Sequence, residues 1–170
     1  MRLLRAVASA LDPRAYLHAF RMLNHYNTTH VTPRRALTCG PGPAISPTAQ
    51  FANAARITLG ARAHVGSGCI LWAGPGQGRI TAGDNLLLGP NVLITAANYR
   101  FRDGSPVTEQ TMQEQSITIG HDVWIGAGTI ILPGAQIGDG AIIAAGAVVR
   151  APVDAMSVVA GTPARVVGRR

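Results

Sequence analysis

The chain has 170 residues, enough for one domain with a short extension. Apolar residues make up 47%, aromatic residues 5% and charged residues 14%, which suits a narrow aliphatic core but leaves the surface of a monomer poorly charged. We therefore expect an oligomer. The net charge of +7 is not accompanied by an RNA- or DNA-binding motif, which argues against nucleic acid as a partner and favours phosphorylated small ligands or an anionic membrane surface.

Residues 1–40 are predicted to form an N-terminal helical cap or extension, with a helix break at Asp12-Pro13. Ala8-Ser9-Ala10 resembles a signal-peptide cleavage site, but the apolar run before it is very short, and no stretch reaches transmembrane length. Two roles stay open. The favoured one is a cap packed on the end of the next domain. The other is a basic amphipathic surface in peripheral contact with the inner face of a membrane that carries a lipid-linked substrate.

A six-residue repeat governs the second predicted domain, residues 41–170. The unbroken C-terminal series of aliphatic residues is Ile119, Ile125, Ile131, Ile137, Ile143 and Val149. Residues two positions earlier are small or aliphatic, and both series face inward because strand residues two apart share a face. Glycine often follows the aliphatic residue, where we expect it to relieve unusual backbone angles at a corner. The period predicts an all-β solenoid of parallel β-helix type, with three hexads in each coil.

The same frame extends backward through a less regular series: Ile45, Phe51, Leu59, Val65, Leu71, Ala82, Leu88 and Ile94. Two interruptions stand out. One is the turn-rich insertion from Trp72 to Arg79, and the other is a long polar excursion loop at about residues 97–116. Because long loops on a regular scaffold commonly carry function, acceptor choice and catalysis are expected at these interruptions.

Cys39 and Cys69 are isolated thiols without metal-ligand spacing or a disulfide framework. Both are expected to serve packing. We therefore expect no bound metal, and the reduced cytoplasm as the compartment.

Residues 117–128, ITIGHDVWIGAG, resemble the signature of the hexapeptide-repeat acyltransferases, and residues 158–167, VVAGTPARVV, resemble the closing coil of that family. Within that family, the chain resembles the galactoside, maltose and polysaccharide O-acetyltransferases. This resemblance implies a left-handed β-helix assembled as a homotrimer, with acetyl-coenzyme A as co-substrate in the groove between subunits. It further implies O-acetylation of a sugar hydroxyl in a polysaccharide, lipopolysaccharide or glycolipid precursor.

The resemblance also implies which residues bind the coenzyme. Main-chain groups of the C-terminal coils would hold the pantetheine arm, and basic residues near the C-terminus would meet the phosphates. Transferred to this chain, the coenzyme-binding positions are Gly126, Ala127, Ala145, Gly146, Arg150, Arg165 and Arg169.

Acyl transfer to a hydroxyl requires removal of its proton, a task that suits histidine near neutral pH. The family commonly places this histidine at the start of the long loop, where Asn98 and Tyr99 stand here. His121, just after the loop and expected to face outward, is the substitute that we favour as base, and His64 is a weaker one. Phenols titrate at about pH 10, so Tyr99 is expected to orient a hydroxyl, while Asn98 hydrogen-bonds the acceptor or the thioester carbonyl.

Both interruptions supply candidate acceptor-binding residues: Trp72, Gln77, Arg79, Arg100 and Asp103. A zinc-dependent carbonic anhydrase is excluded because only two histidines lie within the solenoid, and such a site needs three. N-acetylation of an amino sugar or an antibiotic stays open, as does a catalytically silent trimer that serves binding or scaffolding.

Overall fold

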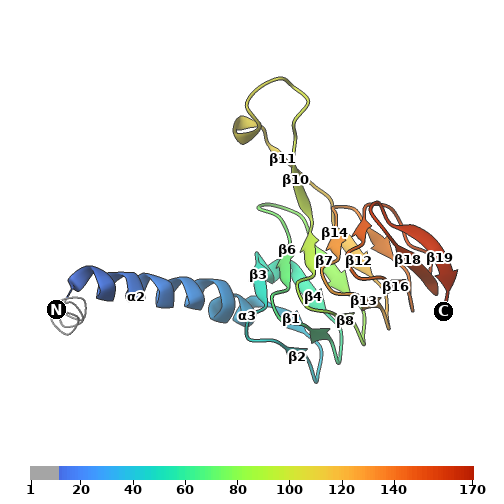
Figure 1. Ribbon diagram of the computed structural model, residues 1–170, viewed down its shortest axis with the longest axis horizontal. Helices are drawn as coiled ribbons and strands as arrows, with labels where there is room; N and C mark the ends of the chain where they lie inside the picture. Colours follow the sequence, from blue (N-terminus) through green and yellow to red (C-terminus); the bar gives the residue numbers. More distant parts are fainter. Residues whose placement is uncertain (1–11) are drawn as a thin grey trace, which may run out of the picture.

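The computed structural model describes residues 12–170. They form a left-handed parallel β-helix with a helical N-terminal segment and one protruding hairpin (Figure 1), so the predicted solenoid is confirmed. The signal-peptide-like Ala8-Ser9-Ala10 lies outside the described residues.

The coils contribute short strands to three sheets, A, B and C, which the chain visits in turn. Sheet A contains β1 (Thr38–Cys39), β4 (Ile57–Leu59), β7 (Ile80–Ala82), β12 (Ile117–Ile119) and β15 (Gln136–Ile137). Sheet B contains β2 (Ala44–Ile45), β5 (His64–Val65), β8 (Leu87–Leu88), β13 (Trp124–Ile125), β16 (Ile142–Ile143), β18 (Ser157–Ala160) and β19 (Arg165–Arg169). Sheet C contains β3 (Gln50–Ala52), β6 (Ile70–Trp72), β9 (Leu93–Thr95), β14 (Ile130–Ile131) and β17 (Val148–Val149). Pairing is parallel except for β18 with β19, which close the C-terminal end as an antiparallel pair.

The core is the aliphatic column that the six-residue repeat predicts. Of the positions in the frame, Ile45 alone is half-buried and the rest are buried. Residues two positions earlier in the C-terminal series, such as Ile117 and Thr129, are also fully buried, and Thr129 donates its hydroxyl hydrogen to the Ala144 carbonyl oxygen (3.1 Å). Cys69 is buried in the same column, and burial raises the pKa of its thiol, which keeps it inert.

The glycines that follow the aliphatic residues have a different role from the expected one. Gly126 does not have a positive φ, whereas Gly128, two residues later, does (φ 67°). A Cβ added at Gly126 would lie 2.5 Å from the Ala145 backbone nitrogen of the next coil. Close stacking of neighbouring coils, rather than unusual backbone angles, therefore selects glycine there.

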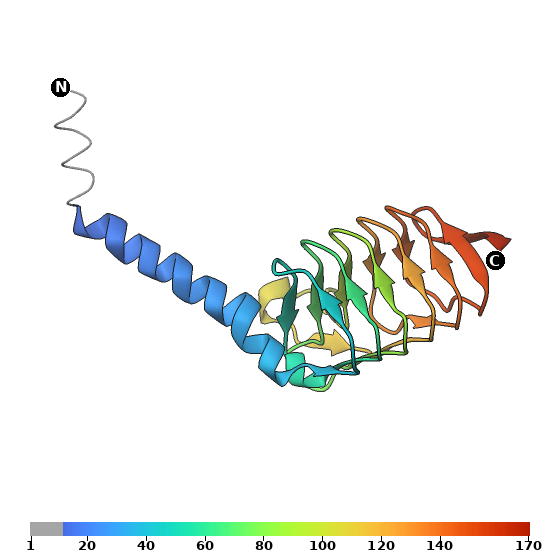
Figure 2. The same cartoon turned by 90° about the horizontal axis from the view of Figure 1, so that it is seen from below.

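The helical segment caps the solenoid only through its last part. Helix α2 (Pro13–Tyr26) begins where the break was predicted, with the Asp12 carboxylate accepting from the Arg14 N–H (2.9 Å). It contains no buried residue and projects away from the coils (Figure 2). The following π-helical turn η1 (Asn27–Val31) and helix α3 (Thr32–Ala36) pack on β3 and on the short helix η2 (Ala54–Arg56). The expected cap is thus wrong for most of α2, which buries no side chain, and its last residue, Tyr26, reaches the first coil by donating its O–H to the Pro47 carbonyl oxygen (3.5 Å).

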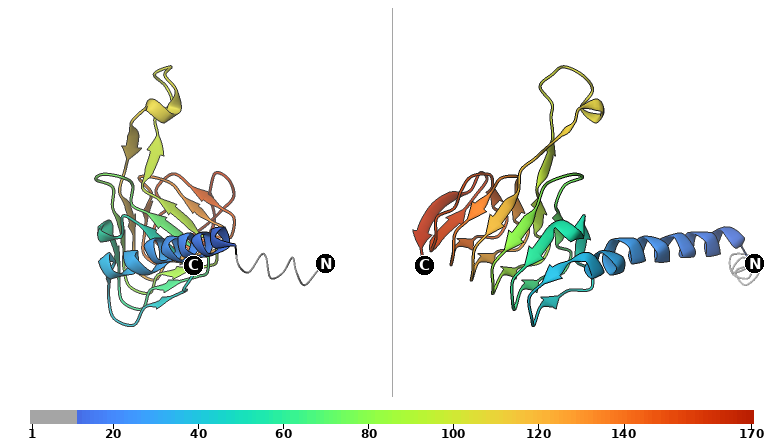
Figure 3. Two further views of the ribbon diagram at one scale, coloured as in Figure 1. Left: turned by 90° about the vertical axis from the view of Figure 1, so that its left-hand side faces the viewer. Right: turned by 180° about the vertical axis from the view of Figure 1, so that it is seen from behind.

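The excursion loop is a hairpin rather than an irregular segment. Strands β10 (Ala97–Tyr99) and β11 (Met112–Glu114) pair antiparallel, and Asn98 lies opposite Gln113. The tip carries the short helix η3 (Val107–Glu109). The hairpin rises from one corner of the coils, between sheets C and A (Figure 3).

Within residues 12–170, no helix combines the length and the apolar character needed to cross a bilayer. The same part of the chain contains no group of three or more His, Cys, Asp or Glu side chains placed to hold a metal ion.

Candidate active site

Each coil turns at three corners, which we name AB, BC and CA after the sheets they join. The CA corner brings together the two interruptions of the repeat. Trp72 of β6 pairs with Thr95 of β9, directly below the hairpin. The insertion that begins at Trp72 therefore lies beside the base of the excursion, although about 20 residues separate them in sequence.

A hollow of about 210 Å³ lies at this CA corner, and its lining includes three of the predicted site residues, Asn98, Tyr99 and Arg150. The Asn98 side-chain oxygen accepts from the Tyr99 N–H (2.9 Å), and the Tyr99 side chain is 47% exposed. Gln115 and the Leu132-Pro133 turn complete the wall toward the coils. This hollow, the base hollow, therefore offers an amide, a phenol and a guanidinium to one small ligand.

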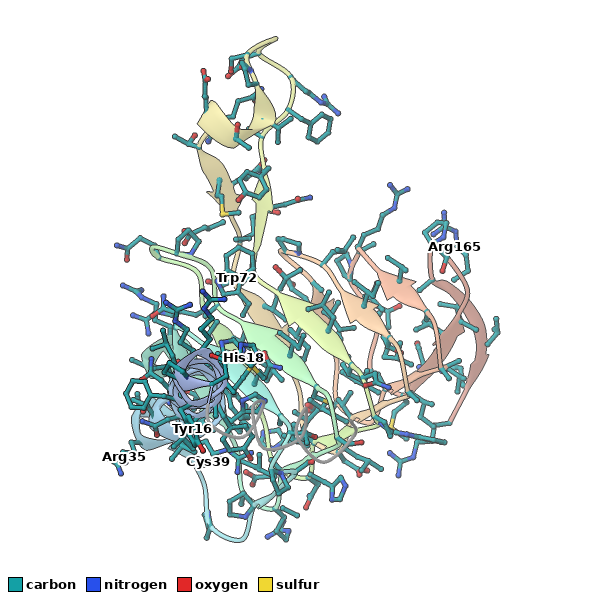
Figure 4. All side chains as sticks on the ribbon, turned by 60° about the vertical axis from the view of Figure 1, so that its left-hand side comes forward. Tyr16, His18, Arg35, Cys39, Trp72 and Arg165 are labelled. Carbon is teal, nitrogen blue, oxygen red and sulfur yellow. The ribbon has the colours of Figure 1, made fainter. Side chains whose placement is uncertain are left out.

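The predicted pantetheine positions gather at the BC corner. Gly126 and Ala127 turn one coil there, Ala145 and Gly146 turn the next, and the Gly146 N–H donates to the Ala127 carbonyl oxygen (2.9 Å). Arg165 lies near this corner. It pairs with Ala160, and Thr162, in the turn between these two residues, donates its hydroxyl hydrogen to the Gly146 carbonyl oxygen (3.4 Å). Figure 4 shows Arg165 at the opposite end of the solenoid from Tyr16 and His18 on α2.

Two of the three predicted coenzyme arginines lie elsewhere in the chain. Arg150 follows β17 and lines the base hollow at the CA corner. Arg169 pairs with Ser157 at the other end of β19, about 13 Å along the strand from Arg165. Within one chain, Arg165 near the BC corner, Arg150 at the CA corner and Arg169 at the far end of β19 therefore lie apart, and their contacts with the coenzyme stay predictions.

His121 lies at the AB corner, whereas Asn98 and Tyr99 lie at the CA corner. The His121 ring Nδ1 accepts a hydrogen bond from the backbone N–H of Asp84 (3.0 Å), and the backbone N–H of His121 donates to Asp139 Oδ1 (2.7 Å). An imidazole that accepts at Nδ1 carries its proton on Nε2, so the outward nitrogen is a donor. This geometry argues against His121 as the general base. Instead, His121 joins the AB corners of adjacent coils through its hydrogen bonds to Asp84 and Asp139. His64 lies exposed at the start of β5 in sheet B, in the coil next to the one that leads into the hairpin.

The predicted acceptor residues divide between the insertion and the hairpin. Gln77 and Arg79 are exposed on the insertion, and Arg100 is exposed where β10 enters the hairpin tip. The Asp103 carboxylate instead accepts from the Ser105 hydroxyl (2.6 Å) and the Ser105 N–H (2.9 Å), which together lower its pKa. Asp103 therefore closes a turn of the tip, which leaves less of its carboxylate for a substrate than the sequence suggested.

Sequence reasoning missed Glu114, the residue that joins the two interruptions. Its carboxylate accepts from three successive backbone N–H groups of the insertion: Gly76 at 2.7 Å, Gly78 at 2.5 Å, and Gln77. The Gly78 N–H makes the largest contribution to lowering the pKa of Glu114. Successive N–H groups in a glycine-rich turn form an anion-binding nest. The signal in the sequence was the glycine-rich turn itself, without any indication of which anion fills it.

Exchange of Glu114 for glutamine is expected to loosen this junction. Glutamine accepts at one oxygen only, so amide hydrogen exchange at Gly76, Gln77 and Gly78 should accelerate by about an order of magnitude. The matched control is the substitution Glu109→Gln at an exposed position, which should leave the hydrogen-exchange rates of these three amides unchanged. Folding lowers the pKa of Glu114 below its ordinary value of 4.5. The stabilisation of the folded state by this carboxylate is therefore complete above pH 4.5 and is lost as the pH falls through the folded pKa. If the hydrogen-exchange rates of these amides were the same in the Glu114→Gln variant as in the wild type, Glu114 would not hold the insertion to the hairpin.

A family model described as bacterial transferase hexapeptide (six repeats) matches residues 116–151. The galactoside O-acetyltransferase of Escherichia coli strain K12 is 30% identical over 155 residues, covering 85% of this chain and 72% of that protein. The chain belongs to the hexapeptide-repeat acyltransferases. The predicted family and enzyme class are thereby confirmed.

Two solved structures support the same assignment. A maltose O-acetyltransferase from Clostridium difficile 630 has a TM-score of 0.72 at 27% identity, covering 89% of this chain and 84% of that one. A galactoside acetyltransferase in complex with coenzyme A has a TM-score of 0.70 at 27% identity, covering 92% of this chain and 81% of that one. Both matches include the N-terminal coils, which the family model leaves out.

Proposed function

We propose that this protein is an acetyl-coenzyme A-dependent O-acetyltransferase that works as a homotrimer on a sugar hydroxyl of a polysaccharide, lipopolysaccharide or glycolipid precursor. The observation that carries the proposal is the similarity to galactoside O-acetyltransferase over most of the chain. The low content of charged residues, 14%, supports burial of part of the surface between subunits.

In this proposal the BC corner binds the coenzyme. Ala127 and Ala145 are exposed there on stacked coils, and small side chains let a narrow pantetheine arm approach the main chain. The exposed guanidinium of Arg165 lies at the same end and suits a phosphate group. Arg169 is proposed as a phosphate contact only across a subunit boundary, given its distance along β19.

The base hollow is proposed as the reaction site, where the thioester end of a coenzyme bound at the BC corner of a neighbouring subunit meets the acceptor. The acceptor hydroxyl attacks the thioester carbonyl carbon, the carbon–sulfur bond breaks, and the departing sulfur takes the proton that the hydroxyl loses. The Tyr99 O–H, which both donates and accepts, relays this proton. Asn98 holds the acceptor, and the Arg150 guanidinium stabilises the oxyanion of the tetrahedral intermediate.

Release of free thiol from acetyl-coenzyme A with a panel of neutral, amino and phosphorylated sugars tests the proposal. We expect acceptor-dependent thiol release, an ester-linked acetyl group by mass spectrometry, and the mass of three chains by light scattering. An amide-linked product on amino sugars alone would replace O-acetylation by N-acetylation. Absence of coenzyme binding in calorimetry would refute the transferase and favour a silent binding trimer.

Peripheral contact with the inner face of a membrane is part of the same proposal. Helix α2 exposes Leu17, Phe20 and Leu23, and no acidic residue occurs between Asp12 and Asp84. Exposed apolar side chains next to basic ones suit an anionic bilayer surface. The protein should float with anionic vesicles but not with zwitterionic ones, and Phe20→Asp should abolish flotation. Flotation that is equal for both vesicle types would contradict this contact.

A further inference from the structure

A second, open hollow of about 620 Å³ lies along the hairpin toward its tip, and we name it the tip hollow. Its lining residues are Tyr99, Arg100, Phe101, Arg102, Asp103, Gln110 and Gln113. Three of these, Tyr99, Phe101 and Gln113, also line the base hollow. The two hollows therefore adjoin at Tyr99, and one extended ligand can occupy both.

Gln110 gives the tip hollow a built polar group. Its side chain is only 7% exposed, and its Nε2 donates to the Ser105 carbonyl oxygen (2.8 Å). Its Oε1 is buried and has no hydrogen-bond partner among the described residues. Buried polar atoms are nearly always hydrogen-bonded, and an unmet acceptor is costly. A hydroxyl or N–H group of a ligand would satisfy this oxygen.

The charge of the tip hollow is positive. Arg100 and Arg102 contribute two exposed guanidiniums, and neither has a carboxylate partner within 4.0 Å in the described part of the chain. Asp103, the only acidic residue of the lining, is bound to Ser105. The Arg102 guanidinium lies 5.6 Å from the centre of the Phe101 ring, a cation–π arrangement that holds it beside an exposed aromatic face. Guanidiniums bind phosphate groups through paired N–H donors.

We propose that the tip hollow is a subsite for a glycosyl phosphate acceptor, an inference that rests on the proposed acetyl transfer. Arg100 and Arg102 bind the phosphate, a sugar hydroxyl donates to Gln110 Oε1, and the Phe101 ring packs against the apolar face of the sugar. The acceptor hydroxyl then reaches Tyr99 in the base hollow. A nucleoside diphosphate sugar and a polyprenyl diphosphate sugar share this chemistry.

Calorimetry with the full chain and two matched probes, glucose 1-phosphate and glucose, tests the subsite directly. The phosphate should strengthen binding by at least about tenfold, and the Arg100→Gln, Arg102→Gln double variant should remove that ratio. The matched control is Arg35→Gln, an exposed arginine of α3, which should keep the ratio. Gln110→Leu should weaken both probes by a similar factor, because its contact is with the sugar rather than with the phosphate.

Equal affinity for the two probes, an unchanged ratio in the double variant, or no binding of any phosphorylated probe would each overturn the subsite. UDP-glucose and a farnesyl diphosphate-linked glucose then distinguish the two sources by which binds more tightly. If acetyl transfer to neutral sugars is found without phosphate preference, the proposed function stands and the subsite fails. If phosphate preference is found without coenzyme binding, the subsite stands and the proposed function fails.

Discussion

Replacement of Tyr99 by phenylalanine is expected to lower kcat about 100-fold with little change in the affinity for acetyl-coenzyme A. The variant keeps the ring that lines both hollows but removes the O–H that is proposed to relay the proton. Arg150→Gln should lower kcat to a similar extent, because it removes the charged donor that is proposed to stabilise the oxyanion. Initial rates of thiol release under saturating coenzyme measure both effects.

His121→Ala is the informative comparison for this prediction. His121 lies at the AB corner with Nδ1 already bound to the Asp84 N–H, so its turnover should stay within about threefold of the wild type. Circular dichroism and light scattering should verify that the fold and the molecular mass of the variant match those of the wild type. Full activity of Tyr99→Phe together with an inactive, folded His121→Ala would reverse the assignment and restore His121 as the base.

Leu88→Ala is expected to lower the free energy of unfolding by about 2–5 kcal/mol. Leu88 is fully buried in the aliphatic column, and its side chain packs between coils that cannot collapse onto the resulting cavity. Urea denaturation at a fixed protein concentration measures the change, since assembly would also contribute to stability.

The neighbouring residue supplies a matched control of the same type. Leu87 precedes Leu88 in β8 but faces outward and is 41% exposed, so Leu87→Ala should cost about 1 kcal/mol or less. A similar loss in both variants would mean that the outward face of sheet B is also buried, for example between subunits. A larger loss at Leu87 than at Leu88 would contradict the assigned register.

The repeat predicted the inward-facing residues with few errors because a strand alternates its faces and a hexad returns each residue to an equivalent position. Ile119, Ile131 and Ile143 needed no knowledge of distant contacts. The role of Gly126 was different, since its clash partner, the Ala145 backbone, belongs to another coil. Helix α2 was misplaced for a related reason. Its amphipathic pattern shows that an apolar face exists but does not say what covers that face.

The candidate site depended still more on the third dimension. Asn98 and Tyr99 were recognised from the local motif, but Arg150, 51 positions beyond Tyr99, joins them only because β17 ends at the same CA corner. Glu114 is separated from Gly76 by 38 positions, and no local pattern in the sequence links them. Conversely, His121 follows the hairpin closely in sequence, yet strand β12 of sheet A lies between them and places His121 at the AB corner.

The amino-acid sequence alone therefore determined the solenoid, its register, its family and the two interruptions at which function was expected. The family was recognised from the resemblance of residues 117–128 and 158–167. The other properties depend on side-chain periodicity within a few residues, which local chain geometry translates directly into inward and outward faces. Only the tertiary structure showed that Arg150 lines the same hollow as Tyr99, that a close approach of the next coil requires glycine at position 126, and that Glu114 joins the insertion to the hairpin. Those outcomes depend on the lateral stacking of coils, where residues far apart in the chain become neighbours.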